Sequence, residues 1–207
     1  MRLRRNSSLV IVLAAAMMVF GAVTARAADS AIPQITRLNA ALLETMKAAT
    51  KLGYQGRYKK LFPVIKATYD LNFMTRYSAG RHWRDLTDAQ RKKLIDAFTR
   101  LTVATYAERF DGYSGETFKI TSEETPRAGT RLVHSELIKS DGEPVKLNYL
   151  MRKTKEGWQV IDVFLKGTIS ELATKRSEYS STLENKGFDG LMAIFEQKIS
   201  HLNAAKS

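Results

Sequence analysis

The spacing of hydrophobic residues changes twice along this chain, and this change limits the folds that the chain can adopt. From residue 32 to residue 110, apolar side chains recur every three or four positions, which is typical of helices. Between residues 118 and 166 they alternate with polar residues, as in strands, and after Gly167 the helical spacing returns. No repeat or low-complexity linker interrupts residues 29–207. Helices on both sides of a run of strands predict one α+β domain.

Short sequence signals place the ends of the helices. Asp70 can cap a short helix that begins at Leu71. Thr87 and Gln90 form a capping box, in which each side chain bonds the backbone N–H of the other residue, so the longest helix should begin there. Gly53 and Gly187 should each end a helix. The other predicted helices cover about residues 32–52, 58–69, 170–186 and 189–202.

The segment between the helices predicts four antiparallel strands joined as a meander. Ser140-Asp141-Gly142 is a hairpin turn, and the residues after it alternate between apolar and polar. The apolar side chains of this strand would form a continuous exposed stripe unless helices cover them. We therefore expect helices packed on one face of a four-stranded, curved antiparallel sheet, enclosing an apolar pocket. The stripe consists of Val145, Leu147, Tyr149 and Met151.

The N-terminal segment has the pattern of a secretory signal peptide. Three arginines within the first five residues precede an apolar run from Leu9 to Val23, and Ala25-Arg26-Ala27 follows. The run has 15 residues, fewer than the roughly 18 that favour a membrane-spanning helix. We predict cleavage after Ala27, with an uncleaved anchor as the alternative, and a single domain over residues 28–207. Cleavage removes four arginines and no acid, so the net charge falls from +12 to +8.

This excess of positive charge has two interpretations. It can steer an exported domain toward anionic membrane surfaces or acidic partners, or it can simply keep helix surfaces soluble. Arg57, Lys59 and Lys60 are candidates for contact with a lipid headgroup or a membrane. Nucleic acid is not an expected partner outside the cytoplasm.

The residues offer little for catalysis. The absence of cysteine excludes disulfides, thiolate zinc sites and thiol nucleophiles, and the three histidines are not spaced for a metal. We therefore predict no metal and no cofactor. Asp162 lies in the most apolar strand, where burial would raise its pKa and suit it to act as a general base. The simpler interpretation is a structural acid that pairs with a nearby cation.

Several segments together resemble the MlaC family of periplasmic phospholipid carriers, also called the toluene-tolerance auxiliary family. The resemblance covers nearly all of the chain after Ala27. Three further segments, residues 52–58, 106–116 and 168–173, are more similar to the hopanoid-associated branch, HpnM, and Thr174-Lys175 replaces the Asn-Tyr that is usual in phospholipid carriers. The segments that carry the family resemblance are residues 69–74, 80–90, 97–98, 105–107, 144–145, 157–163, 176–179 and 187–191.

The resemblance implies a shuttle that moves a hopanoid or a phospholipid between the inner and outer membranes without catalysis. Its partners would be an inner-membrane lipid transporter, an outer-membrane complex and, transiently, the membrane surface. Two other functions stay open from the residues alone: a small cone-shaped α+β isomerase or dehydratase with Asp162 as the base, and a periplasmic adaptor that binds only proteins. The residues that we expect to line or support the lipid pocket are Phe73, Met74, Trp83, Phe98, Tyr106, Leu147, Tyr149 and Met151.

Overall fold

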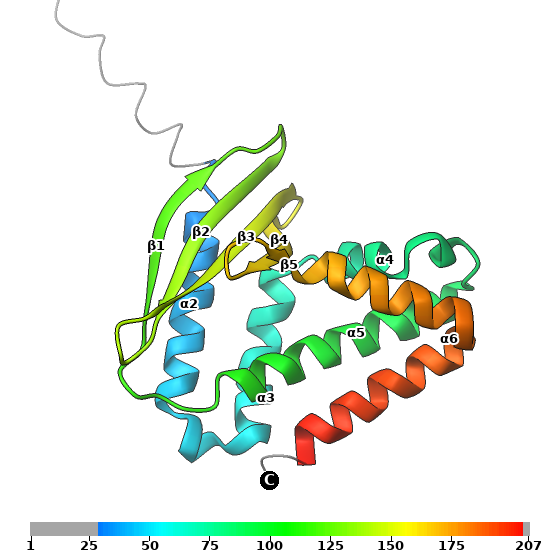
Figure 1. Cartoon of the computed structure of the whole chain (residues 1–207), viewed down its shortest axis with the longest axis horizontal. Coiled ribbons are helices and arrows are strands. Elements are labelled where there is room, and N and C mark those ends of the chain that lie inside the picture. The colour runs from blue at the N-terminus through cyan, green and yellow to red at the C-terminus, as the bar shows by residue number, and fades with distance from the viewer. Residues whose placement is uncertain (1–28, 205–207) are drawn as a thin grey trace, which may run out of the picture. The chain divides into compact units, whose positions relative to one another are not determined.

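The computed structural model describes residues 29–204, and residues 31–204 form one body of helices and strands (Figure 1). The predicted signal peptide, residues 1–27, lies outside the described residues. Within residues 29–204, no helix is both long enough and apolar enough to span a membrane. The body belongs to the α+β class, as the sequence predicts.

The strands form one antiparallel sheet in chain order. The prediction of four strands was wrong by one, because β5 has two residues and is too short to show an alternating pattern. β-bulges in the β1–β2 and β3–β4 pairs add to the bend of the sheet (Figure 1). The five strands are β1 (Thr117–Glu124), β2 (Thr130–Ile138), β3 (Pro144–Thr154), β4 (Gly157–Leu165) and β5 (Ile169–Ser170).

The helices begin where the capping signals predict. The side chain of Asp70 accepts a hydrogen bond from the backbone N–H of Phe73 at 2.9 Å, and the capping box of Thr87 and Gln90 is present. Both predictions are confirmed. The helical elements are α2 (Ile32–Lys47), α3 (Ala49–Thr68), α4 (Leu71–Ala79), the 3-10 helix η1 (Gly80–Arg84), α5 (Asp88–Arg109) and α6 (Glu171–Ala204).

Two glycines that were expected to end helices instead change their direction. Gly53 has φ 59° and ψ −179° inside α3, and Gly187 has φ 65° and ψ −172° inside α6. This backbone region is open almost only to glycine. After Gly187, the second half of α6 runs back beside α5 (Figure 1), where Arg100 forms an ion pair with Glu196.

The core lies between the helices and one face of the sheet. On β2, alternation places Val133, Ser135 and Leu137 on the same face. Ser135 accepts a hydrogen bond from the amide of Asn39 on α2 at 3.3 Å, so α2 covers this face. The fully buried members of the core include Ile35, Leu38, Leu61, Ile65, Phe98, Val133, Met151, Val160 and Phe195.

Candidate functional site

An apolar cavity of about 320 Å³ lies between the helices and the sheet. Its lining comes from α4, α5 and α6 on one side and from β2, β3 and β4 on the other, together with Tyr69 just before α4. Most of the lining side chains are apolar or aromatic. A hollow of this size and lining is at the lower end of the range for small-molecule sites, about 300–1,000 Å³. The aromatic residues of the lining are Tyr69, Phe98, Tyr106, Phe110, Tyr149 and Tyr179.

Five of the eight residues proposed from the sequence lie around this cavity. They come from three separate elements: Met74 from α4, Phe98 and Tyr106 from α5, and Leu147 and Tyr149 from β3. Their convergence follows from the alternation on β3 and the helical spacing on α5.

The other three residues do not line the cavity. Phe73 is half-buried under the guanidinium of Arg152, 4.5 Å from its ring centroid, and stacks on Tyr77. Trp83 lies in η1 with the guanidinium of Arg91 5.6 Å from its ring. Met151 is fully buried in the core. Phe73 and Trp83 thus pack against arginine side chains, and Met151 is part of the hydrophobic core.

Three of the tyrosines that line the cavity, Tyr69, Tyr106 and Tyr149, bring hydroxyl groups to a mostly apolar lining. The hydroxyls of Tyr69 and Tyr106 hydrogen-bond to each other, and the Tyr106 ring packs edge-on against that of Tyr69. Burial raises the pKa of Tyr69 and of Tyr149 well above 10, and it raises the pKa of Tyr106 to about 12. The ionised phenolates are disfavoured here, so these groups are neutral hydroxyls at neutral pH.

Tyr69 is held in place by the sheet. It forms a parallel bridge with Val160 of β4, and the backbone N–H of Asp70 donates to the Val160 carbonyl at 2.9 Å. The carboxylate of Asp70 caps α4 and accepts a 2.7 Å hydrogen bond from Nε of Arg152 on β3. These contacts fasten the start of α4, and with it one wall of the cavity, to two strands.

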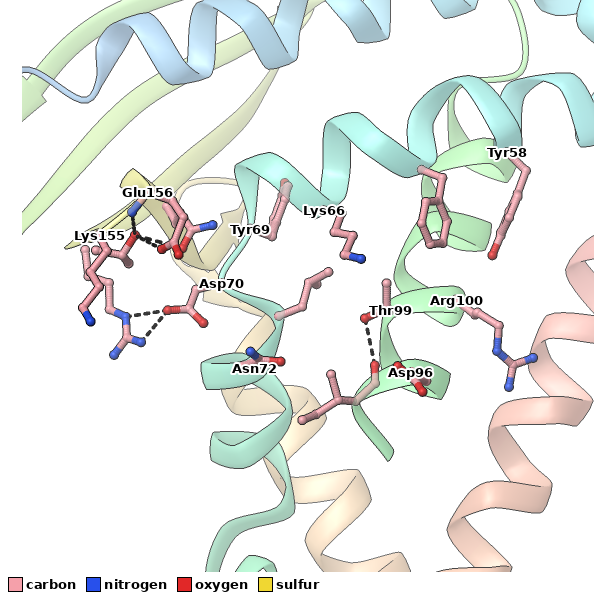
Figure 2. Close-up of a pocket in the computed structure, with 16 residues that line it drawn as sticks. Tyr58, Lys66, Tyr69, Asp70, Asn72, Asp96, Thr99, Arg100, Lys155 and Glu156 are labelled. Carbon is pink, nitrogen blue, oxygen red and sulfur yellow. Dashed lines mark hydrogen bonds and ion pairs between the residues drawn. The ribbon is translucent and has the colours of Figure 1, made fainter. Parts of the chain in front are cut away.

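A second, more polar hollow shares Tyr69 with the apolar cavity. Figure 2 shows this hollow with Tyr69 among its lining residues. This groove, of about 870 Å³, is bounded by α3, α4, α5 and the turn between β3 and β4. Its lining contains both apolar side chains, such as Tyr58, Phe62 and Ile95, and charged ones. Many of its charges are paired within the protein, among them Asp70 with Arg152, Asp96 with Lys92 and Arg100 with Glu196. This groove was not predicted from the sequence.

Asp162 has a structural role instead of the position of a base. Asp162 and Val163 are consecutive in β4, so their side chains point to opposite faces of the sheet. Val163 lines the apolar cavity, whereas Asp162 lines neither hollow. Its carboxylate accepts from the N–H of Val163 at 2.7 Å, from the N–H of Leu172 at 3.0 Å and from the hydroxyl of Ser170 at 2.5 Å. The carboxylate therefore anchors the start of α6 to β4. This corrects the interpretation of Asp162 as a catalytic base.

Arg57 is also not where a membrane contact requires it. Only 4% of the residue is exposed, and its guanidinium donates to the carbonyl oxygens of Ala107 at 2.8 Å and Ala49 at 3.3 Å. It ties the kinked helix α3 to the end of α5. Lys59 remains exposed, whereas Lys60 pairs with Glu44 at 3.5 Å. The prediction of a headgroup or membrane contact is therefore wrong for Arg57.

Comparison with known proteins gives two findings. The family model described as MlaC protein matches residues 36–197. The fold is similar to that of a phospholipid-binding protein from Ralstonia solanacearum, solved in complex with a phospholipid, with a TM-score of 0.73. The two chains are 22% identical, and the match covers 82% of this chain and 97% of that one. At this identity the likeness concerns the fold.

Proposed function

The chain belongs to the MlaC family, and on that premise we propose that it carries a lipid whose apolar part lies in the cavity between the sheet and the helices. The observation that carries the proposal is the cavity itself, with its aromatic and aliphatic lining. The Ralstonia protein of similar fold binds a phospholipid, which supports a lipid as the ligand class. Membership of this family makes the chain a carrier and not a catalyst.

Burial of hydrocarbon supplies the free energy of binding. Each methylene transferred from water contributes about 0.8 kcal/mol, so a dozen carbons contribute about 10 kcal/mol before the cost of ordering the lipid is subtracted. No covalent step is needed. Release requires a partner that opens the cavity or offers an equally apolar site, because a carrier must also let its ligand go.

The side chains that we propose to contact the lipid are those that line the cavity. Phe98, Tyr106, Leu147 and Tyr149 would contact the hydrocarbon from opposite walls, and Met74 would close one side. Phe73, Trp83 and Met151 would support the walls from outside.

Localisation and partners complete the proposal. We infer that residues 1–27 direct export to the periplasm and are removed after Ala27. An inner-membrane lipid transporter would load or unload the protein, and an outer-membrane complex would be the other partner. The sequence similarity to the HpnM branch keeps a hopanoid beside a phospholipid as the proposed cargo.

The test is to purify the exported protein without detergent and to compare its native mass spectrum with that of an organic extract. We expect about one hopanoid or phospholipid per chain. A protein that is reproducibly empty and takes no lipid from vesicles would contradict the proposal and favour an adaptor that binds only proteins. Mass spectrometry of the intact chain also reports whether residues 1–27 are absent.

A further inference from the structure

The apolar cavity is also lined by a few charged side chains. Its lining includes three cations, Arg109, Lys166 and Lys175, and one carboxylate, Glu171. Arg109 and Lys166 are exposed, so they mark where the cavity meets solvent. The lining therefore carries two more positive than negative charges.

One of these cations, Lys175, is neutralised by the carboxylate of the same lining. Nζ of Lys175 lies 3.4 Å from the carboxylate of Glu171, and both side chains are about three-quarters buried. In residues 29–204, neither Arg109 nor Lys166 has an ion-pair partner. Two unpaired cations thus stand beside an apolar hollow, which is the arrangement that a ligand with a hydrocarbon body and an anionic end would complete.

The backbone at Lys166 provides a second, independent observation. The turn between β4 and β5 is closed by a hydrogen bond from the N–H of Thr168 to the carbonyl of Leu165 at 3.2 Å. Lys166 has φ 52° and Gly167 has φ 84°, as in a type I′ turn, where asparagine or glycine is favoured at the first of these positions. Lys166 is the one residue other than glycine with positive φ in the described part of the chain. An unfavourable residue in a turn at a cavity indicates a function for its side chain.

We propose that Arg109 and Lys166 bind the anionic group of the lipid at the opening of the cavity, and so select anionic amphiphiles over neutral or zwitterionic ones. This inference rests on the proposed function, since the apolar part of the same molecule occupies the cavity. A phosphate diester or a carboxylate would accept charge-assisted hydrogen bonds from both side chains. In a zwitterionic lipid, the headgroup's own ammonium group neutralises the phosphate and weakens its attraction to the two cations. A neutral polycyclic lipid would leave both cations unpaired.

The expected preference is moderate, because both cations are exposed to solvent. An exposed ion pair contributes roughly threefold to a binding ratio, so two pairs give a preference of about tenfold. Salt should reduce this preference, because added ions screen exposed charges.

The experiment loads the delipidated full-length mature protein from vesicles that contain equal amounts of phosphatidylglycerol and phosphatidylcholine with identical acyl chains. Both lipids are then offered at the same membrane surface, so attraction of the basic protein to the vesicle does not favour either one in the extract. Mass spectrometry of the extracted lipids gives the bound ratio and the total amount. We expect the wild type to hold about ten times more phosphatidylglycerol.

The test variant is Arg109→Gln with Lys166→Asn. Asparagine suits the turn at least as well as lysine, and both positions are exposed, so the variant should remain folded. Its lipid ratio should fall to about one, because the preference for phosphatidylglycerol depends on the two cations. The matched control, Arg76→Gln with Lys93→Gln, removes the same charge from exposed positions that do not line the cavity, and it should keep the wild-type ratio.

The outcomes separate this inference from the proposed function. An equal ratio in the wild type, or an unchanged ratio in the Arg109 and Lys166 variant, would overturn the inference while lipid loading persists. A fall of the ratio in the control variant as large as in the test variant would also overturn it, because general charge would then be the cause. A wild type that loads neither lipid would contradict the proposed function itself. Binding of inorganic phosphate to the empty protein, together with an equal lipid ratio in the wild type, would assign the two cations to free phosphate and not to a headgroup.

Discussion

A carboxylate placed on the wall of the cavity should abolish lipid binding without unfolding the protein. Leu147 is suited to this test because it is half-buried, lines the cavity from β3 and pairs with Leu165 across the sheet. Tyr149, two residues further along, is 1% exposed and belongs to the core, so a charge there would disrupt the fold as well.

The magnitude follows from two contributions. Leu147→Glu removes apolar contact with the lipid worth about 2 kcal/mol. It also leaves a polar group to be desolvated against hydrocarbon, at a cost of at least about 2 kcal/mol. Together these amount to about 4 kcal/mol, or roughly a thousandfold weaker binding.

Two matched variants make the test specific. Leu147→Met keeps the volume and the apolar character of the side chain and should bind lipid as the wild type does. Lys146→Glu introduces the same acidic side chain at the adjacent, exposed position, which alternation places on the other face of β3. Native mass spectrometry after incubation with vesicles gives the lipid stoichiometry, and thermal unfolding reports the fold. A folded Leu147→Glu variant with wild-type stoichiometry would refute the assignment of the cavity to lipid.

Three further predictions concern stability. Burial raises the pKa of Tyr69 and Tyr149 above 10. The contribution of each tyrosine to the free energy of unfolding is therefore complete below pH 10 and decreases by about 1.4 kcal/mol per pH unit as the pH rises further. Urea midpoints measured against pH should decrease less steeply for Tyr149→Phe than for the wild type. Arg57→Ala should lower the free energy of unfolding by about 2–3 kcal/mol through the lost hydrogen bonds to two buried carbonyls, yet leave lipid transfer by the folded protein unchanged; slower transfer to anionic vesicles would restore a membrane role for Arg57. Gly187→Ala should lower the free energy of unfolding by about 1–3 kcal/mol, because alanine is strained at this φ and ψ. An unchanged urea midpoint would contradict this strain.

Local signals predicted the fold well because each depends on a few neighbouring residues. The capping box at Thr87, the cap at Asp70 and the alternation along β3 require no knowledge of distant contacts. The strand β5 was missed because two residues are too few to show an alternating pattern. The breaks at Gly53 and Gly187 were predicted as helix ends, because the sequence does not distinguish the end of a helix from a change in its direction.

The site was predicted less completely than the fold. Leu147 and Tyr149 were found because strand alternation assigns them to the covered face. Trp83 and Phe73 were placed at the pocket because their predicted faces point inward, but Arg91 and Arg152 stack on them outside the cavity. The cations at the opening come from α5, α6 and the turn after β4, and only the folded chain brings them together.

The most direct test of the account is to find where the lipid chain lies. A phospholipid with a photoreactive group at the end of one acyl chain would be loaded from vesicles, irradiated and mapped by peptide mass spectrometry. We expect cross-links to β3 and β4, at Leu147, Tyr149 or Val163 in the cavity. Cross-links confined to Tyr58 and Phe62 of α3, in the groove beyond Tyr69, would contradict it.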